Sequence, residues 1–387
     1  MKKAQNKKYN YSALTARHFN FEVKEVLNVE KEAIKLAKAC KKESKYFDPY
    51  LPPIEELTQI LLNYKEFEKE HGPVPQMLYF DQPAIGDHTK HRKRAGENMI
   101  SLNILGVEDS IAESIMIKTI SIILKENGYK NYTLHLNNIG SKESKTMFNR
   151  ESTAFFRKNI NLLNANCRQM FKKSVHTLIT EGGDQCKVLK EHAPEPMDFL
   201  DEETRDNFSK LIERIETYNI PYEINPEILG DQNYSNYTNF QFVDENGKVI
   251  AAASRFNLLS KKIGIRKDVP SITANIWIKP TKTVSEISIK KIDSNKNFIL
   301  QLGEQAKTFT LKVLEDMWSK KVHSKHNLIK DRLTPQIQES KRVKAENIII
   351  IGQKESNDFN VMIRDAGGRS QKIMSVEELI EYLKNYK

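Results

Sequence analysis

The sequence has few cysteines and no long hydrophobic run. Its apolar runs, such as the one at 348–351, have the length of a strand, whereas a membrane-spanning helix needs about 20 apolar residues. The basic N-terminus is not followed by an apolar segment, which excludes a secretory signal. The three cysteines (Cys40, Cys167 and Cys186) are widely separated and odd in number, which argues for a reducing compartment. These absences predict a cytoplasmic protein without membrane contact.

A standard metal site is also lacking. Cys167, His176, Cys186 and His192 come closest to a set of zinc ligands, but their spacing fits no standard zinc finger. We therefore predict no metal site from these residues.

What the sequence does have is length and positive charge. Its 387 residues, 39% hydrophobic and 29% charged, leave room for two domains and a substantial core. The formal net charge is +10. A basic protein suits a polyanionic partner, because neutralising phosphates supplies most nonspecific affinity for nucleic acid. Charge alone favours nucleic-acid binding only slightly over other functions.

Local patterns predict a mixed α/β protein. Residues 1–20 are polar and basic, as in a poorly ordered tail, and helical spacing favours helices over 21–42, 55–69 and 109–127. Residues 221–264 read as an antiparallel hairpin with its turn at Asn246-Gly247. From residue 298 strands and helices alternate, and Ser375 with Glu378 forms a capping box before the last helix.

The hairpin region carries a resemblance. It reads "INPEILGDQNYSNYTNFQF…AAASRFNLL" and resembles the histidyl-tRNA synthetase signature "INP…LVRGLDYYTGTVFE" followed by "GGGRYDGL". Tyr234, Thr238, Phe240, Arg255 and Leu259 fall on matching positions. Two further stretches, "PVPQMLYFDQPAIGDH" and "PSITANIWIKP", are similar to motifs 2 and 3 of this class II family. The segments "ILQLGEQAKTFTLKVLEDMW" and "AENIIIIGQKE" resemble its anticodon-binding domain.

The resemblance implies an architecture. It implies an antiparallel class II synthetase core with a helical insertion, followed by an α/β anticodon-binding domain. We expect a basic tail and helix at 1–50, where the dimer-forming motif 1 is shortened. The core is expected at 51–284 with its helical insertion near 142–217, a linker at 285–296, and the anticodon-binding-like domain at 297–387. The short motif 1 leaves homodimer formation open.

The residues that the family uses on ATP are replaced. Gly86, Gly230 and Pro280 stand at three family arginine positions, and Trp277 replaces a glycine that lets nucleotide approach the backbone. Each lost arginine contact to developing charge is worth about 2–4 kcal/mol. We therefore expect adenylation and aminoacylation to be lost or strongly impaired, with no cofactor, unless Arg92, Arg94 or Lys279 substitutes in a rearranged ATP and Mg site.

Two groups of residues remain candidates for binding. The motif 2 loop is strongly basic, and its residues Lys90, Arg92, Lys93 and Arg94 form either a solvated loop or a contact to RNA phosphates. The candidate remnants of an amino-acid pocket are Tyr234, Thr238 and Arg255, and the alternative for Tyr234 and Thr238 is ordinary strand core. Arg255 is either functional or part of a structural salt bridge.

Three functions follow from the resemblance. The first is a synthetase relative that binds tRNA or a related RNA in the cytoplasm without catalysis. The second is a divergent but active histidine–tRNA ligase using ATP, histidine and tRNA. The third is a histidine-sensing regulatory subunit of ATP phosphoribosyltransferase, which usually lacks an anticodon-binding domain, so residues 297–387 speak against it.

Overall fold

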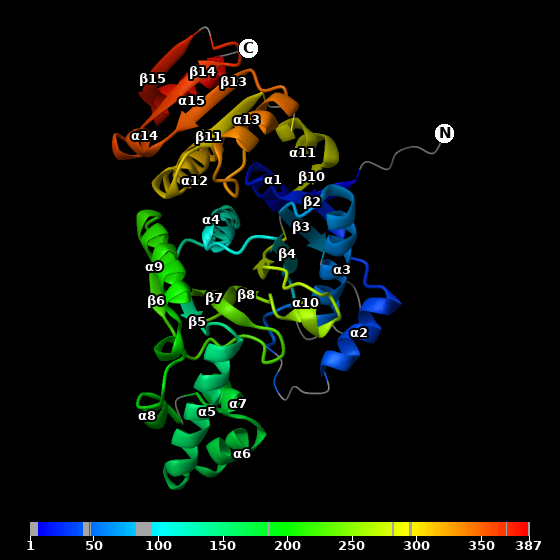
Figure 1. Ribbon diagram of the computed structural model, residues 1–387, viewed down its shortest axis with the longest axis vertical. Helices are drawn as coiled ribbons and strands as arrows, with labels where there is room; N and C mark the ends of the chain where they lie inside the picture. The colour runs from blue at the N-terminus through cyan, green and yellow to red at the C-terminus, as the bar shows by residue number, and fades with distance from the viewer. Residues whose placement is uncertain are drawn as a thin grey trace.

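A large mixed sheet forms the centre of the protein. The computed structural model describes residues 7–41, 46, 48–82, 94–183, 186–280, 282–293, 296–368 and 370–385 (Figure 1). The eight strands of this sheet lie in the spatial order β2-β3-β4-β9-β8-β7-β5-β6. Their bounds are β2 Glu22–Val26, β3 Gln76–Gln82, β4 Asn98–Leu105, β5 Tyr132–Asn138, β6 Tyr222–Ile224, β7 Asn236–Asp244, β8 Val249–Arg255 and β9 Ser271–Ile278. The inner pairs are antiparallel and only the two edge pairs are parallel, so the antiparallel core is confirmed.

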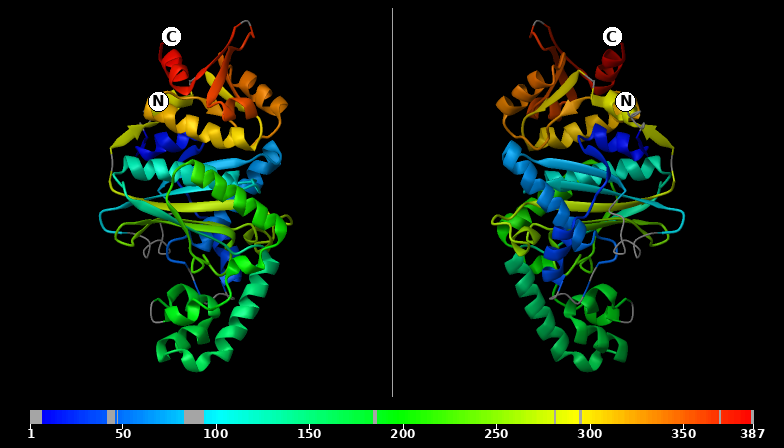
Figure 2. Two further views of the ribbon diagram at one scale, coloured as in Figure 1. Left: turned by 90° about the vertical axis from the view of Figure 1, so that its left-hand side faces the viewer. Right: turned by 90° about the vertical axis from the view of Figure 1, so that its right-hand side faces the viewer.

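Helices cover both faces of this sheet. The helices α4 (Ile111–Glu126) and α9 (Glu202–Thr217) share a hydrophobic core with one face. On the other face lie α3 (Ile54–His71) and α2 (Lys31–Lys41), which pack against each other. A short helix, α10 (Leu259–Lys262), contacts α3. Figure 2 shows α4 on the side of the sheet that faces the C-terminal strands.

The helical insertion projects from the other end of the molecule (Figure 1). It comprises α5 (Lys142–Lys158), η2 (Ile160–Leu162), α6 (Ala165–Lys173), α7 (Val175–Glu181), α8 (Lys187–Lys190) and η4 (Pro196–Phe199). Ser141, Asn164 and Ser174 cap α5, α6 and α7, each accepting a backbone N–H with its side chain. The insertion has a hydrophobic core of its own, which includes Phe148, Phe156 and Leu178.

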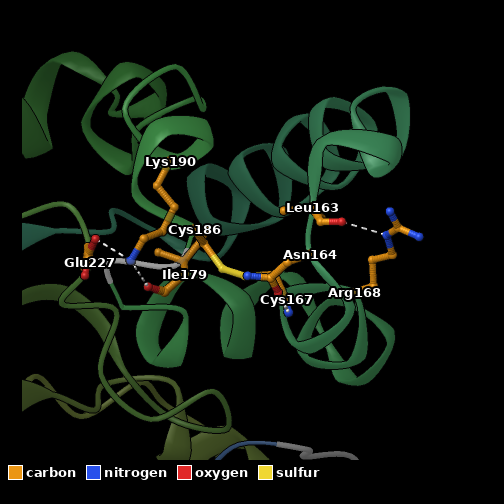
Figure 3. Close-up of a disulfide and its surroundings, with 8 residues drawn as sticks. All are labelled: Leu163, Asn164, Cys167, Arg168, Ile179, Cys186, Lys190 and Glu227. Atoms are coloured by element: carbon orange, nitrogen blue, oxygen red, sulfur yellow. Dashed lines mark hydrogen bonds and ion pairs between the residues drawn. A yellow bond between two sulfur atoms is a disulfide. The ribbon is translucent and has the colours of Figure 1, made fainter.

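A disulfide joins two helices of this insertion (Figure 3). It links Cys167 on α6 with Cys186, which immediately precedes α8, and the two Cα atoms are 6.4 Å apart. The bond differs from our expectation of reduced cysteines, and the third cysteine, Cys40, takes no part in it. Nearby, Lys190 joins the insertion to the rest of the chain through an ion pair of 2.5 Å with Glu227.

The C-terminal part is built on a second, five-stranded sheet with the order β12-β11-β13-β14-β15. Its strands are β11 Asn297–Gln301, β12 Lys325–His326, β13 Asn347–Ile351, β14 Asn360–Asp365 and β15 Gln371–Ser375, and its helices are α12 Glu304–Ser319, α13 Leu333–Arg342, α14 Gln353–Asn357 and α15 Val376–Asn385. The predicted capping box is confirmed, since the Glu378 carboxylate accepts from the Ser375 N–H and the Ser375 hydroxyl from the Glu378 N–H. The short strands and α13 were missed, because they are too brief or too polar to show a clear period.

The N-terminal expectations were wrong. Residues 1–6 of the predicted tail at 1–20 lie outside the described residues. In the rest of it, β1 (Lys8–Asn10) pairs with β10 (Thr283–Ser285), and α1 (Ser12–His18) packs against α11 (Glu286–Asp293). Instead of one helix over 21–42, β2 precedes α2. The physical reason is tertiary. The polar chain at 7–20 supplies only a few apolar side chains, but these side chains, such as Phe19, are fully buried between the core and the C-terminal part.

Candidate functional site

The site to which the motifs point lies on one face of the eight-stranded sheet. Strand residues alternate between faces, and in β9 Ile272, Ala274 and Ile276 join the core shared with α4. Thr273, Asn275 and Trp277 therefore point to the opposite face. There the pairing register places Thr273 between Asn103 of β4 and Ser254 of β8, and Ser254 next to Asn239 of β7. These four side chains form a polar row across the sheet, and all four are fully buried.

This polar row contains unsatisfied atoms. Among the described residues, three oxygen atoms of the row have no hydrogen-bond partner: Asn103 Oδ1, Thr273 Oγ1 and Asn239 Oδ1. The same holds for Asn275 Oδ1, two residues further along β9. A buried polar atom without a partner costs about 1–3 kcal/mol. A packed apolar core would have avoided this cost, so the row marks a surface that is specialised for polar contacts.

Residues 48–53 cover this face. Asn275 Nδ2 donates to the Tyr50 carbonyl at 3.0 Å, and the Tyr234 hydroxyl donates to the Pro52 carbonyl at 2.7 Å. The Tyr50 ring meets the Trp277 ring edge-on, with 6.1 Å between the ring centres. Tyr234 is thereby held in the hydrophobic core on this side of the sheet.

Trp277 and Arg94 fill the space beside the motif 3 strand. The Arg94 guanidinium carbon lies 4.0 Å from the centre of the Trp277 ring, and Arg94 Nη1 donates to the Val249 carbonyl at 2.7 Å. Trp277 is 1% exposed. Of the residues predicted to contact RNA, Arg94 is therefore already engaged with the protein, while Lys90, Arg92 and Lys93 lie outside the described residues, as does Gly86.

Gly230 stands where a side chain would have to displace its neighbours. Its φ is +65°, a left-handed conformation that residues with a side chain rarely adopt. A Cβ atom at this position would overlap the side chains of Asn239 and Ser235. The Gly230 carbonyl also accepts a hydrogen bond of 2.9 Å from Nε2 of the buried His176. Pro280, by contrast, is exposed just beyond the end of β9.

Buried charges surround Gly230. Asp231 Oδ1 accepts from the backbone and side-chain N–H groups of Asn233 at 2.8 and 2.9 Å, and Asp231 Oδ2 accepts from the Asp48 N–H at 3.3 Å. Lys145 of α5 donates to the Ser235 carbonyl at 2.8 Å. Burial raises the pKa of Asp48 to about 7, with Asp231 adding to the rise, and burial lowers the pKa of Lys145 to about 8.

Arg255 and Thr238 lie elsewhere, on the α4 side of the sheet. The Arg255 guanidinium forms a two-point ion pair with Glu113 of α4, at 2.5 and 2.6 Å, and Arg255 Nη1 also donates to the Val107 carbonyl at 2.8 Å. Both side chains of the pair are 2–3% exposed. Thr238 and Arg255 line a common cavity of about 140 Å³, which does not include Tyr234. The structure thus separates the residues predicted as one pocket remnant.

Tyr237 shares this small cavity and was missed. Its φ is +50°, a strained value for a residue with a side chain, and such strain often occurs at functional positions. The family signature has a glycine at this position, and this difference is the sequence signal that could have identified Tyr237.

Of the zinc candidates, Cys167 and Cys186 are bonded to each other. The described residues contain no group of three or more His, Cys, Asp or Glu side chains arranged to hold a metal ion.

Two features distinguish this face. The Trp277 indole is buried beside the motif 3 strand, and a Cβ atom at position 230 would overlap the side chains of Asn239 and Ser235. None of the described helices is both long and apolar enough to cross a membrane.

Comparisons with known proteins agree with the motifs. Residues 296–386 match the family "Anticodon binding domain". The histidine–tRNA ligase of Staphylococcus carnosus is 22% identical over 339 residues, covering 85% of this chain and 79% of that protein. Among solved structures, apo histidyl-tRNA synthetase of S. aureus is 18% identical with a TM-score of 0.43, covering 85% of this chain and 82% of that one. A Bacillus halodurans structure titled "ATP phosphoribosyltransferase regulatory subunit/histidyl-tRNA synthetase" is 11% identical with a TM-score of 0.44, covering 88% of this chain and 92% of that one.

Proposed function

We propose that this homologue of the histidine–tRNA ligases, with its anticodon-binding domain, binds tRNA or a related structured RNA and does not activate histidine. The observation that carries the proposal is the surroundings of Gly230. A family arginine there would have to overlap Asn239 and Ser235. Restoring an arginine would require a strained left-handed backbone and a shift of both side chains.

The anticodon-binding domain and the net charge support the RNA part of the proposal. A charge of +10 favours association with a phosphate backbone. The domain at 296–386 is the part of the chain most similar to a module named for anticodon binding. The proposed function is cytoplasmic and linked to translation. The Cys167–Cys186 disulfide would then have to form, or be dispensable, in a reducing compartment.

Two assays on purified protein test the two parts separately. Pyrophosphate exchange into ATP, with histidine and magnesium, is expected to stay at background. In a gel shift, folded tRNA is expected to bind this protein more tightly than it binds a charge-matched control protein. The binding to this protein is expected to weaken as the salt concentration rises. Exchange above background would overturn the catalytic part, and binding no tighter than the control would overturn the RNA part.

A divergent active ligase is the second candidate, and one observation favours it. Arg94 places a guanidinium over Trp277, beside the motif 3 strand. If Arg94 replaces a missing family arginine, exchange will be detected and will be lost in Arg94→Ala. A histidine-sensing regulatory subunit is disfavoured by the anticodon-binding match, and failure to co-purify with a phosphoribosyltransferase would exclude it.

A further inference from the structure

A second cavity, remote from the polar row, lies where the N-terminal helix meets the C-terminal part. Its volume is about 780 Å³, within the range of small-molecule sites. It lies among α1, α11 and the C-terminal end of α12, and α1 contacts both of the other helices (Figure 1). The side chains on which the argument depends are Tyr11, Ser288, Lys291, Trp318, Lys321 and His323. None of the family motifs falls on these residues.

The aromatic wall of this cavity is held in place. Trp318 is half-buried, and its Nε1 donates to Glu126 at 2.7 Å. The His18 and His323 rings pack against it, with ring-centre distances of 5.2 and 5.5 Å. An indole whose orientation is fixed in this way loses little conformational freedom when a flat ligand stacks on it. Tyr11, at the start of α1, adds a second aromatic ring to the lining.

The lining is net positive. Lys291 and Lys321 contribute two ammonium groups, and Glu126 is the one carboxylate among the lining residues. Both Glu126 oxygens already accept hydrogen bonds, Oε1 from Trp318 at 2.7 Å and Oε2 from the Thr15 hydroxyl at 2.5 Å. Over the whole lining, two ammonium groups outweigh one carboxylate, so the cavity attracts negative charge.

His323 supplies a neutral acceptor. His18 Nε2 lies 2.8 Å from the Leu314 carbonyl, which can only accept, so this nitrogen carries the proton and His18 Nδ1 is an acceptor. His323 Nδ1, 3.2 Å from His18 Nδ1, must then donate. Burial lowers the pKa of both histidines, which keeps them neutral at pH 7. This chain of bonds leaves His323 Nε2 as an acceptor for a ligand.

Aromatic rings combined with lysines are the means by which proteins bind nucleotides without reading their sequence. Bases stack on aromatic side chains, and lysines contact phosphate. We propose that this cavity binds one phosphorylated nucleoside. Its base lies against Trp318 and Tyr11, its phosphate contacts Lys291 and Lys321, and an N–H or hydroxyl group donates to His323. The nucleoside is either a free mononucleotide or one unstacked nucleotide of a bound RNA, and only the second source rests on the function proposed above.

Tryptophan fluorescence of the full-length protein tests this proposal. The chain has two tryptophans, and Trp277 is buried under Arg94, so a stacking ligand acts on Trp318. AMP and UMP are the probes, with adenosine and inorganic phosphate as half-ligands. The test variant is Lys291→Gln with Lys321→Gln. Its matched control is Lys290→Gln with Lys320→Gln, which removes two exposed lysines one position away that do not line the cavity.

If the source is a free nucleotide, AMP or UMP quenches Trp318 saturably, each half-ligand binds more weakly, and the test variant weakens binding about tenfold or more because two charge-assisted contacts are lost. The control variant binds as the wild type does. If the source is RNA, the mononucleotides do not quench, but tRNA does, and the test variant binds tRNA more weakly than the control variant. Both results support the site.

The proposal is overturned if neither mononucleotide nor tRNA alters Trp318 fluorescence, or if the two double variants bind equally. Its failure can be told apart from failure of the proposed function. Quenching by AMP without tRNA binding keeps the cavity site and removes the RNA function. Binding of tRNA with identical behaviour of both variants keeps the RNA function and removes the cavity site.

Discussion

The Arg94 guanidinium carbon lies 4.0 Å from the centre of the buried Trp277 ring, and Arg94 also donates to the Val249 carbonyl. The two residues come from motif 2 and motif 3, whose strands β4 and β9 are paired. An arginine expected in a phosphate-binding loop thus packs on a tryptophan that replaces a family glycine. This contact gives Arg94 a structural role beside β9.

The first prediction concerns this contact. Arg94→Ala should lower the free energy of unfolding by about 1–2 kcal/mol, from a lost cation–π contact and a lost hydrogen bond. Urea unfolding measures the loss, and tRNA affinity should change little. Arg92→Ala removes the same charge two residues earlier and serves as the comparison. A variant that keeps its stability but loses tRNA affinity would show that Arg94 binds phosphate instead.

The second prediction concerns Gly230. Gly230→Ala should destabilise the protein by more than the about 1–2 kcal/mol that a left-handed conformation costs a residue with a side chain, because its Cβ also meets Asn239 and Ser235. Gly247→Ala is the matched control, since Gly247 has a φ of +77° and open space around its Cβ position. Thermal unfolding compares the two. Equal losses of stability would mean that the side chains around Gly230 move aside at little cost. Gly230→Arg should then be tested for pyrophosphate exchange.

The third prediction concerns the ion pair of Arg255 and Glu113. Arg255→Gln leaves the Glu113 carboxylate buried without its partner and should cost about 3–5 kcal/mol. The double change to Arg255→Met with Glu113→Leu removes both charges and should recover part of that loss. Denaturant unfolding of Arg255→Met, of Glu113→Leu and of the double variant completes the cycle. If Arg255→Gln folds as stably as the wild type yet binds tRNA poorly, the residue is functional instead of structural.

The fourth prediction is acid destabilisation. Burial lowers the pKa of His18 and His176 to about 3 and that of His326 to about 4. Unfolded histidine titrates near 6.5, so the unfolded chain binds more protons below that pH. The resulting stability is present above pH 6.5 and is lost as the pH falls, by up to about 1.4 kcal/mol per pH unit for each histidine.

His176→Asn isolates one of these contributions, because asparagine can still donate to the Gly230 carbonyl but does not titrate. The fall of unfolding free energy between pH 6.5 and 4.5 should be shallower in this variant. Asp48 acts in the opposite direction, since its raised pKa makes stability decline as the pH rises towards 7, but it is common to both proteins. Identical pH slopes would show that His176 is protonated in the folded state.

The fifth prediction concerns the disulfide of the insertion. Cys167 and Cys186 are 19 residues apart in the sequence, and a loop of this size contributes about 3 kcal/mol when closed. Reduction should therefore expose the insertion to proteolysis while the main sheet stays folded, because the insertion has its own hydrophobic core. Limited proteolysis with and without reductant measures this. Cys167→Ser with Cys186→Ser should cleave rapidly under both conditions, and resistance of the reduced wild type would mean that the bond adds no stability.

Much of the fold could be predicted from the sequence, because its signals are local. The Asn246-Gly247 turn is a short-range signal and β7 and β8 do form the predicted hairpin. The Ser375–Glu378 capping box depends on residues three apart. The order of the motifs likewise predicted an antiparallel core followed by an anticodon-binding domain. By contrast, the sequence predicts a helix where β2 lies. The pattern Glu-Val-Lys-Glu-Val is stabilised as a strand by its pairing with β3, which local spacing does not reveal.

The sequence by itself determined the family resemblance, the loss of arginine at three motif positions and the positive charge, since each is a property of residue identity and order. Only the tertiary structure decided what those residues do. It showed that a side chain at position 230 would have to displace its neighbours, that Trp277 and Arg94 fill the space beside the motif 3 strand, and that Thr238 and Tyr234 do not share a pocket. It also joined Cys167 to Cys186 and placed Tyr11, Lys291 and Trp318 around one cavity. The physical reason is side-chain packing: Arg94 with Trp277 and Tyr11 with Trp318 are more than a hundred positions apart, and even for close neighbours such as Gly230 and Ser235 no period or spacing in the sequence shows which side chains meet.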